Sequence, residues 1–180
     1  LAIFLGDVSG KGMPAALFMI AVRTLSRQLA PVATGPGDLL CRLDRALKAD
    51  NPTHLYVTLL CGFYDDRSGE LVLAMGPPPR PLLRRLAGST EGVPLRPAMM
   101  IGCAPVELRV TEHRMTLAPG ETVIGYTDGF TEACAPDGHT EFGLERLQQV
   151  LAGGLGGALT ECAAAAARAV QEFTGQKELQ

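Results

Sequence analysis

The spacing of apolar residues changes twice along this 180-residue chain, and each change separates helical segments from strands. Apolar residues recur every three or four positions between Pro14 and Lys48, then alternate or run together from Tyr56 to Gly129. Helical spacing returns from Phe142 onward. Helices and strands that occupy separate blocks favour an α+β fold with antiparallel strands over a strictly alternating α/β fold.

The individual elements follow from the same patterns and from the turn residues between them. Strands are expected at 1–5, 56–66, 70–76, 79–86, 107–117 and 122–129. Helices are expected at 14–29, 39–48, 142–151 and 158–173, with a glycine-rich interruption at 153–157 and a loop at 88–105. The prolines of 79–86 limit that strand to a sheet edge, or else stand at its start.

Charge and cysteine content exclude several classes of protein. A formal net charge of −3 argues against a nucleic-acid-binding surface, and we interpret the cluster of Arg80, Arg84 and Arg85 as a solvated face. The five cysteines form no C-x-x-C pair, which argues against a zinc site and suits a reducing, cytoplasmic location. No apolar run of about 18 residues is present, so we expect no membrane insertion.

The chain starts inside a strand-like run, without a Met and without the basic leader of a signal peptide. We therefore expect it to be a piece of a longer protein.

The stretch GDVSGKG, residues 6–12, looks at first like a phosphate-binding loop. A P-loop requires G-x-x-x-x-G-K-S/T, but Gly6 stands one residue too close to Gly10 and Gly12 occupies the hydroxyl position. A nucleophile elbow around Ser9 also fails, because Asp7 occupies the place of its first glycine. The stretch is therefore neither of these motifs.

A metal site agrees better with the residues. Asp7 and Asp128 are each expected at the end of an apolar strand, next to glycines that allow close approach of a ligand. Carboxylate and carbonyl oxygens are the ligands that Mg²⁺ and Mn²⁺ prefer. The spacing alone leaves a second interpretation open, in which both aspartates only cap or turn the chain, as Asp137 is expected to do.

Two long motifs, GDVSGKGMPAALFM at 6–19 and VIGYTDGFTEA at 123–133, together resemble the bacterial metal-dependent protein phosphatases of the PPM type. The nearest group is that of the stage II sporulation protein E-like phosphatases, which includes regulators of sigma-factor partner switching. The resemblance continues through YVTLLCGFYDDRSGELVLA, APGE and PDGHTEFGLERL, in the family's order. It covers most of the chain.

The resemblance implies one domain over residues 1–180, truncated at both ends, with an antiparallel β-sandwich flanked by helices in α-β-β-α layers. It further implies that Asp7 bridges two Mn²⁺ or Mg²⁺ ions, that the Val8 carbonyl binds one of them, and that Asp128 binds one. A water held between the metals would then attack the phosphorus of a phosphoserine or phosphothreonine. Asp7 and Asp128 are accordingly the expected catalytic residues.

In relatives the substrate is often an anti-anti-sigma factor, and an upstream sensor domain often controls activity. The resemblance therefore implies a phosphorylated regulatory protein as partner, a sensor or regulatory domain upstream, and a homodimer as one assembly to test.

Departures from the family pattern support an alternative, a catalytically inactive phosphatase-like interaction domain. The chain starts after the position of the family's upstream Gly-Gly-Asp segment and stops before that of its downstream Asp-Asp segment. Where relatives carry A-N-A-G-H, residues 74–81 read AMGPPPRP, and Lys11 stands where relatives often have histidine.

Overall fold

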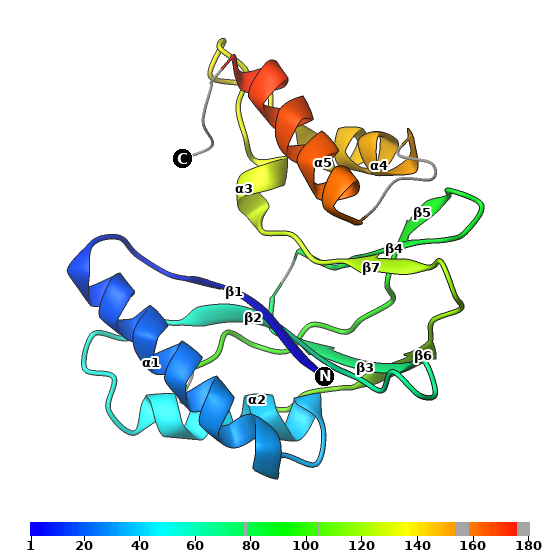
Figure 1. Ribbon diagram of the computed structural model, residues 1–180. Coiled ribbons are helices and arrows are strands. Elements are labelled where there is room, and N and C mark those ends of the chain that lie inside the picture. The colour runs from blue at the N-terminus through cyan, green and yellow to red at the C-terminus, as the bar shows by residue number, and fades with distance from the viewer. Residues whose placement is uncertain (78, 104, 154–158, 176–180) are drawn as a thin grey trace. The chain divides into compact units, whose positions relative to one another are not determined.

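The computed structural model describes residues 1–77, 79–103, 105–153 and 159–175 (Figure 1). The chain forms two compact units. Unit 1 comprises Leu1–Pro78 and Pro94–Ala118, and unit 2 comprises Pro79–Val93 and Pro119–Gln180. Each unit combines an antiparallel sheet with helices, so the predicted α+β class is confirmed.

Unit 1 is built on a four-stranded antiparallel sheet in the order β1-β2-β3-β6. Its strands are β1 (Ala2–Val8), β2 (Val57–Tyr64), β3 (Glu70–Met75) and β6 (His113–Thr116). The predicted hairpin of β2 and β3 is confirmed, with Leu60 opposite Met75. The strand β1 forms one edge of the sheet, since it pairs with no strand but β2 among the described residues.

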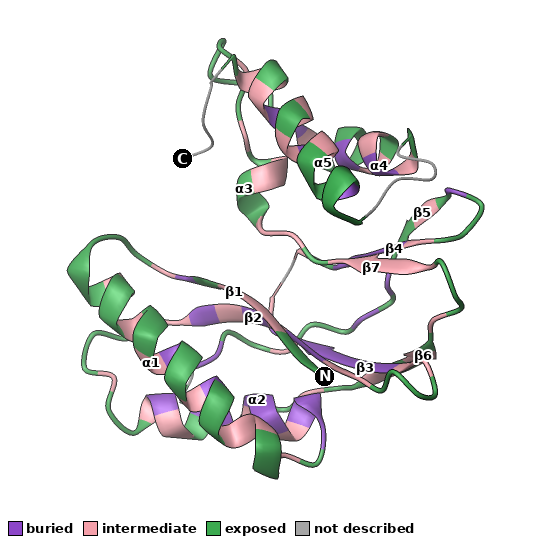
Figure 2. Cartoon of the chain, in the orientation of Figure 1, coloured by how far each residue is buried: buried purple, intermediate pink, exposed green. Residues whose placement is uncertain are grey.

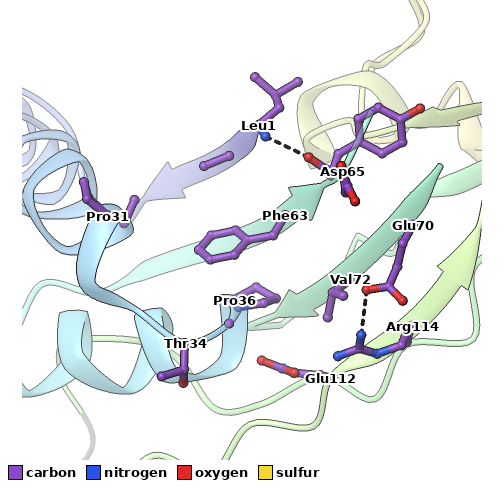
Figure 3. Close-up of a pocket in the computed structure, with 14 residues that line it drawn as sticks. Leu1, Pro31, Thr34, Pro36, Phe63, Asp65, Glu70, Val72, Glu112 and Arg114 are labelled. Carbon is purple, nitrogen blue, oxygen red and sulfur yellow. Dashed lines mark hydrogen bonds and ion pairs between the residues drawn. The ribbon is translucent and has the colours of Figure 1, made fainter. Parts of the chain in front are cut away.

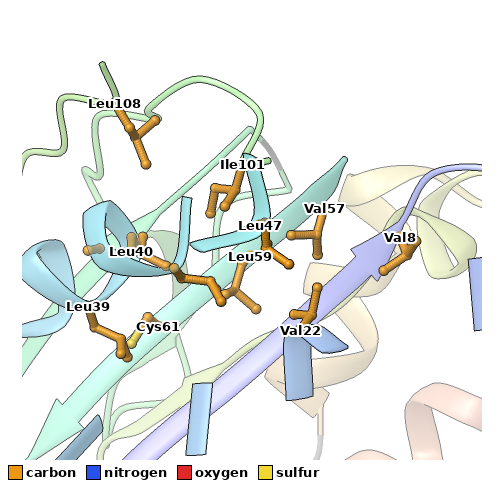
Figure 4. Close-up of a cluster of buried hydrophobic side chains, with 12 residues drawn as sticks. Val8, Val22, Leu39, Leu40, Leu47, Val57, Leu59, Cys61, Ile101 and Leu108 are labelled. Atoms are coloured by element: carbon orange, nitrogen blue, oxygen red, sulfur yellow. The ribbon is translucent and has the colours of Figure 1, made fainter. Parts of the chain in front are cut away.

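Two helices, α1 (Met13–Leu29) and α2 (Pro36–Lys48), cover one face of this sheet, and a short 3₁₀ turn, η1 (Ala30–Val32), joins them. Leucines of α2 meet Val8 of β1, Val22 of α1 and Leu59 of β2 in a shared apolar core (Figure 4). Strand side chains alternate between the two faces of a sheet, so Val8 faces the helices and Asp7 faces away from them.

The segment 94–112 of unit 1 is fastened to α2 by a buried carboxylate. Asp44 is almost fully buried, and its Oδ1 accepts a hydrogen bond from the Gly102 amide at 2.9 Å. Its Oδ2 lies 2.5 Å from Nζ of Lys48, which also donates to the Val106 carbonyl at 2.7 Å. This network replaces the lost hydration of Asp44 with charged and backbone donors.

Unit 2 contains a three-stranded antiparallel sheet in the order β5-β4-β7. Its strands are β4 (Leu82–Arg84), β5 (Thr90–Gly92) and β7 (Thr122–Ile124), and its helices are α3 (Asp128–Thr131), α4 (Gly143–Gly153) and α5 (Leu159–Thr174). The core consists of Leu82, Phe142, Leu147, Leu151, Ala166 and Val170. The predicted helices at 142–151 and 158–173 correspond to α4 and α5, although Ala158 lies outside the described residues.

Several strand predictions were wrong in extent. The predicted loop at 88–105 contains β5, because a turn closed by the Arg85 amide on the Ser89 carbonyl folds it back onto β4. The strand predicted at 107–117 is limited to β6, and the one at 122–129 ends at Ile124. The strand predicted at 79–86 is limited to β4, which lies in the centre of its sheet and not at an edge. Pro79 and Pro81 precede β4, so the prediction that the prolines stand at the start of this strand is confirmed.

The arginine cluster is not simply a solvated face. Arg84 donates from Nε to the Leu151 carbonyl at 3.0 Å, which ties β4 to α4. Arg85 forms ion pairs with Glu91 and Glu121, while Arg80 is exposed.

Two other predictions fall partly on residues that are not described: 154–157 of the glycine-rich interruption, and Pro78 of the segment AMGPPPRP. No helix among the described residues is long and apolar enough to cross a membrane.

Candidate functional site

The sequence predicted that Asp7 ends its strand. Asp7 is instead the second-last residue of β1, because pairing with β2 continues through Val8. Its partner across the ladder is Thr58, whose hydroxyl donates to the Asp7 carbonyl at 3.4 Å. The Asp7 residue is exposed, on the sheet face opposite to the helices. Its carboxylate is therefore accessible to a ligand while the backbone is held by the sheet.

The phase of the β1–β2 ladder determines where the Val8 carbonyl points. Leu1 and Tyr64 exchange two hydrogen bonds, and the Ser9 amide donates to the Tyr56 carbonyl at 2.9 Å. Hydrogen-bonded pairs alternate along an antiparallel ladder, so Asp7 is bonded to β2 and the amide and carbonyl of Val8 point outward. Because β1 is an edge strand, the Val8 carbonyl faces the open edge beside the Asp7 carboxylate.

Gly6 is needed for the close approach of β1 and β2. A Cβ at this position would lie 2.7 Å from Cδ1 of Leu59 and 2.9 Å from the carbonyl oxygen of Thr58. The glycine before Asp7 therefore has a packing reason that is independent of any ligand.

The turn after β1 is held at its first residue. The Ser9 hydroxyl accepts a hydrogen bond from the Tyr56 amide at 2.9 Å. Gly10 and Gly12 have φ angles of 85° and 78°, in the region that favours glycine. Lys11 between them is exposed, and α1 begins directly afterwards, so Lys11 and the start of α1 belong to the same surface as the end of β1.

Asp128 lies in unit 2, at the first position of the four-residue helix α3. Its backbone carbonyl accepts hydrogen bonds from the Glu132 amide at 2.8 Å and from the Thr131 hydroxyl at 3.2 Å. The residue itself is exposed. The prediction that Asp128 ends a strand was wrong, because β7 stops at Ile124 and three residues separate it from α3.

The donor atoms are those that a hard divalent cation requires. Asp7 and Asp128 are exposed carboxylates, and the Val8 carbonyl is directed outward, so all three offer oxygen. Within the part of the chain that the structure describes, no group of three or more His, Cys, Asp or Glu side chains gathers around one point. Asp7 belongs to unit 1 and Asp128 to unit 2, and their convergence on one site stays a prediction.

Asp137 behaves as the sequence predicted, as a residue that turns the chain. Its carboxylate accepts hydrogen bonds from the Thr140 hydroxyl and from the amides of Thr140 and His139. These bonds lower the pKa of Asp137 to about 2, with the Thr140 hydroxyl as the largest cause.

A pocket of about 570 Å³ in unit 1 lies at the opposite end of β1 from Asp7 (Figure 3). Its charged residues already serve the fold: Glu112 accepts a hydrogen bond from the Gly37 amide at the start of α2, and Arg114 pairs with Glu70 at 2.6 Å. Sequence reasoning missed this helix cap, because Glu112 is far from α2 along the chain. We assign the pocket no part in the candidate site.

The sequence matches the profile of the stage II sporulation protein E (SpoIIE) family over residues 1–180. The chain belongs to the SpoIIE family. It is accordingly a phosphatase-type domain of the bacterial PPM class, as the two motifs had predicted. A curated relative, protein IcfG of Synechocystis, is 31% identical over an alignment of 185 positions, and the match covers 84% of this chain and 28% of IcfG. The chain thus spans less than a third of that relative.

Solved structures share the fold. The SiaA-PP2C domain of Pseudomonas aeruginosa superposes with a TM-score of 0.80 at 21% identity, over 99% of this chain and 70% of that one. The PP2C phosphatase domain of SpoIIE from Bacillus subtilis, solved with a fragment of its regulatory domain, gives 0.80 at 17% identity, over 97% and 50%. RsbX in complex with magnesium gives 0.66 at 16% identity, over 96% and 73%.

Proposed function

We propose that residues 1–180 act as one metal-dependent protein serine/threonine phosphatase domain. The observation that carries the proposal is the exposed Asp7 carboxylate beside the outward Val8 carbonyl at the edge of β1, in a chain of a phosphatase-type family. Water would displace the serine or threonine oxygen from phosphorus, so that the products are inorganic phosphate and the free hydroxyl of the regulatory protein.

Asp7, the Val8 carbonyl and Asp128 would hold the Mn²⁺ or Mg²⁺ ions. Bound there, the metal lowers the pKa of a water and offsets the charge on the phosphoryl oxygens. The ladder with β2 fixes the Asp7 backbone, so that its carboxylate is held ready for these ions. Lys11, exposed after the strand, adds a cation that favours a phosphorylated substrate.

Two of the similar structures support the metal and the partners. RsbX was solved with magnesium, and SpoIIE with part of a regulatory domain. For this chain we infer a phosphorylated regulatory protein, such as an anti-anti-sigma factor, as substrate, and an upstream domain that controls activity. We place the reaction in the cytoplasm, where such regulators act.

The test is Mn²⁺-dependent release of phosphate from p-nitrophenyl phosphate, with Mn²⁺ binding measured in parallel by calorimetry. We expect Asp7→Asn and Asp128→Asn to lower the rate by about a hundredfold or more, because several kcal/mol of charge stabilisation depend on the metal ligands. Asp66→Asn, which alters an exposed aspartate in the β2–β3 turn of unit 1, is the matched control and should behave as wild type. Wild-type rates in the Asp128 variant would remove that residue from the mechanism.

One observation favours the alternative of an interaction domain without turnover. Among the described residues, neither candidate aspartate belongs to a group of three or more His, Cys, Asp or Glu side chains that could hold a metal ion. In that case wild type would release no phosphate in the presence of Mn²⁺. Binding to a phosphoprotein would still occur.

A further inference from the structure

The outward face of α1 carries large apolar side chains that the fold leaves uncovered. Met13, Leu17 and Ile20 are 72%, 60% and 61% exposed. Their spacing of four and three residues places them on one side of the helix. Val22 and Ser26, on the other side, are buried against the sheet, and Figure 2 shows the contrast between the two sides of α1. A contiguous apolar patch of this kind marks an interaction surface.

The charged residues within α1 and in the turn just before it all have the same sign. Lys11 precedes it, Arg23 and Arg27 follow it, and all three are exposed. The helix α1 contains no Asp or Glu. Among the described residues, no ion pair involves Lys11, Arg23 or Arg27. These cations are therefore available to a partner.

The neighbouring helix α2 differs from α1, because it contains acidic residues that pair with most of its basic ones. Two of its three basic residues, Arg42 and Lys48, are each paired with an aspartate four positions earlier, Asp38 and Asp44, and only Arg45 is in no ion pair among the described residues. A partner that complements α1 must supply the carboxylates or phosphates that α1 lacks, around an apolar centre.

The position of the patch connects it with the candidate site. Met13 is the first residue of α1 and follows directly on the turn that leaves β1 after Asp7 and Val8. A protein bound over Met13 and Leu17 would therefore lie beside the Asp7 carboxylate. The net charge of −3 disfavours binding to an extended anionic bilayer. A protein in contact with α1 lies within a Debye length, about 8 Å, of the local cations, so these cations attract it despite the net charge.

We propose that the outward face of α1, formed by Met13, Leu17 and Ile20 and flanked by Lys11, Arg23 and Arg27, docks the phosphoprotein substrate through an acidic surface with an apolar centre. This inference rests on the proposed function, because it assigns the substrate protein to a surface next to the same site. The docking surface selects the partner protein, and the residues at the edge of β1 act on its phosphate.

The experiment separates docking from catalysis. The probe is an anti-anti-sigma protein phosphorylated on serine, and its binding to the 180-residue chain is measured by fluorescence anisotropy in EDTA, where no turnover occurs. We expect the double variants L17E/I20E and R23E/R27E to raise the Kd at least tenfold. Added salt should weaken binding of wild type and have little effect on R23E/R27E.

The controls are Leu144→Glu on α4 and Arg168→Glu on α5, which alter exposed residues of the same types in unit 2. Both should bind as wild type does. Circular dichroism checks that every variant is folded. Kd values within twofold of wild type in L17E/I20E, or an equal loss in the controls, would overturn the proposal.

Two further measurements would identify a different partner for the outward face of α1. Binding of wild type, but not L17E/I20E, to phosphatidylglycerol vesicles in place of the phosphoprotein would overturn the proposal in favour of a membrane. A wild-type dimer in sedimentation that L17E/I20E abolishes, with no phosphoprotein binding, would overturn it in favour of a second copy. Hydrolysis of p-nitrophenyl phosphate with Mn²⁺ reports the proposed function separately, and the α1 variants should retain it.

Discussion

The two candidate aspartates are positioned by opposite means in the two units. In unit 1, Asp7 lies in a seven-residue strand whose backbone is paired along its whole length with β2. In unit 2, Asp128 opens a helix of only four residues, which three hydrogen bonds between neighbouring residues of the chain stabilise. The backbone of Asp7 thus pairs with a segment about fifty residues away, while that of Asp128 is hydrogen-bonded to its immediate neighbours and Phe130 of the same helix packs on the core of unit 2.

This contrast extends to the glycine beside each aspartate. Gly6, before Asp7, has no room for a Cβ, whereas a Cβ on Gly129, after Asp128, would meet only Oγ1 of Thr127 at 3.7 Å. Similar dipeptides in the two motifs therefore arise for different physical reasons. Unit 1 constrains its site by strand pairing and close packing at Gly6, and unit 2 does so by local hydrogen bonds and by packing of Phe130 on its core.

The largest difference in stability should come from breaking one ion pair in each unit. Asp44→Ala in unit 1 should lower the free energy of unfolding by about 3–5 kcal/mol, because it leaves the Lys48 ammonium and the buried Gly102 amide without their carboxylate partner. Glu91→Ala in unit 2 breaks the exposed pair with Arg85 and should cost no more than about 1 kcal/mol. Urea denaturation measures both, and similar costs would break the comparison.

The glycine pair should give the next largest difference. Gly6→Ala should destabilise the protein by about 1–3 kcal/mol, because the new Cβ overlaps Leu59 and the backbone of Thr58. Gly129→Ala should be neutral or stabilise α3 by up to about 1 kcal/mol, since alanine favours helix and nothing obstructs it. Thermal unfolding of the two variants provides the measurement. Equal destabilisation would mean that Gly129 is as closely packed as Gly6.

The smallest effect concerns pH. Asp137 in unit 2 has a pKa lowered to about 2 by the Thr140 hydroxyl and by the amides of Thr140 and His139. The Asp38 pKa in unit 1 is also lowered, mainly by the Thr34 amide. A lowered pKa contributes stability that is present above the ordinary value of 3.8 and is lost as pH falls through the folded-state value, near 2 for Asp137.

We therefore expect carboxyl chemical shifts to give a midpoint near 2 for Asp137 and below 3.8 for Asp38. The turn at Asp137 should lose its hydrogen bonds only in the most acidic part of the titration. Thr140→Val, which keeps the backbone amide and removes the hydroxyl, should raise the Asp137 midpoint. An Asp137 midpoint at 3.8 in wild type would show that these local bonds do not hold the turn in solution.

The sequence by itself determined the long elements and the family. The helices α1, α2, α4 and α5 and the β2–β3 hairpin follow from apolar periodicity and turn residues, since each is stabilised largely by contacts that recur at a fixed spacing. The two motifs around Asp7 and Asp128 were sufficient to predict the SpoIIE family, because several residues in a fixed order are more specific than any single glycine pattern.

Only the tertiary structure decided the short elements and the directions of individual groups. The three-residue strand β5 and the early end of β7 depend on pairing with β4, a partner that local sequence does not specify. The outward Val8 carbonyl follows from the phase of its ladder with β2, which a shift of one residue would reverse. The exposure of Leu17 on α1 likewise depends on which side of the helix packs on the sheet. These features come from long-range contacts, whose energies do not appear in the spacing of neighbouring residues.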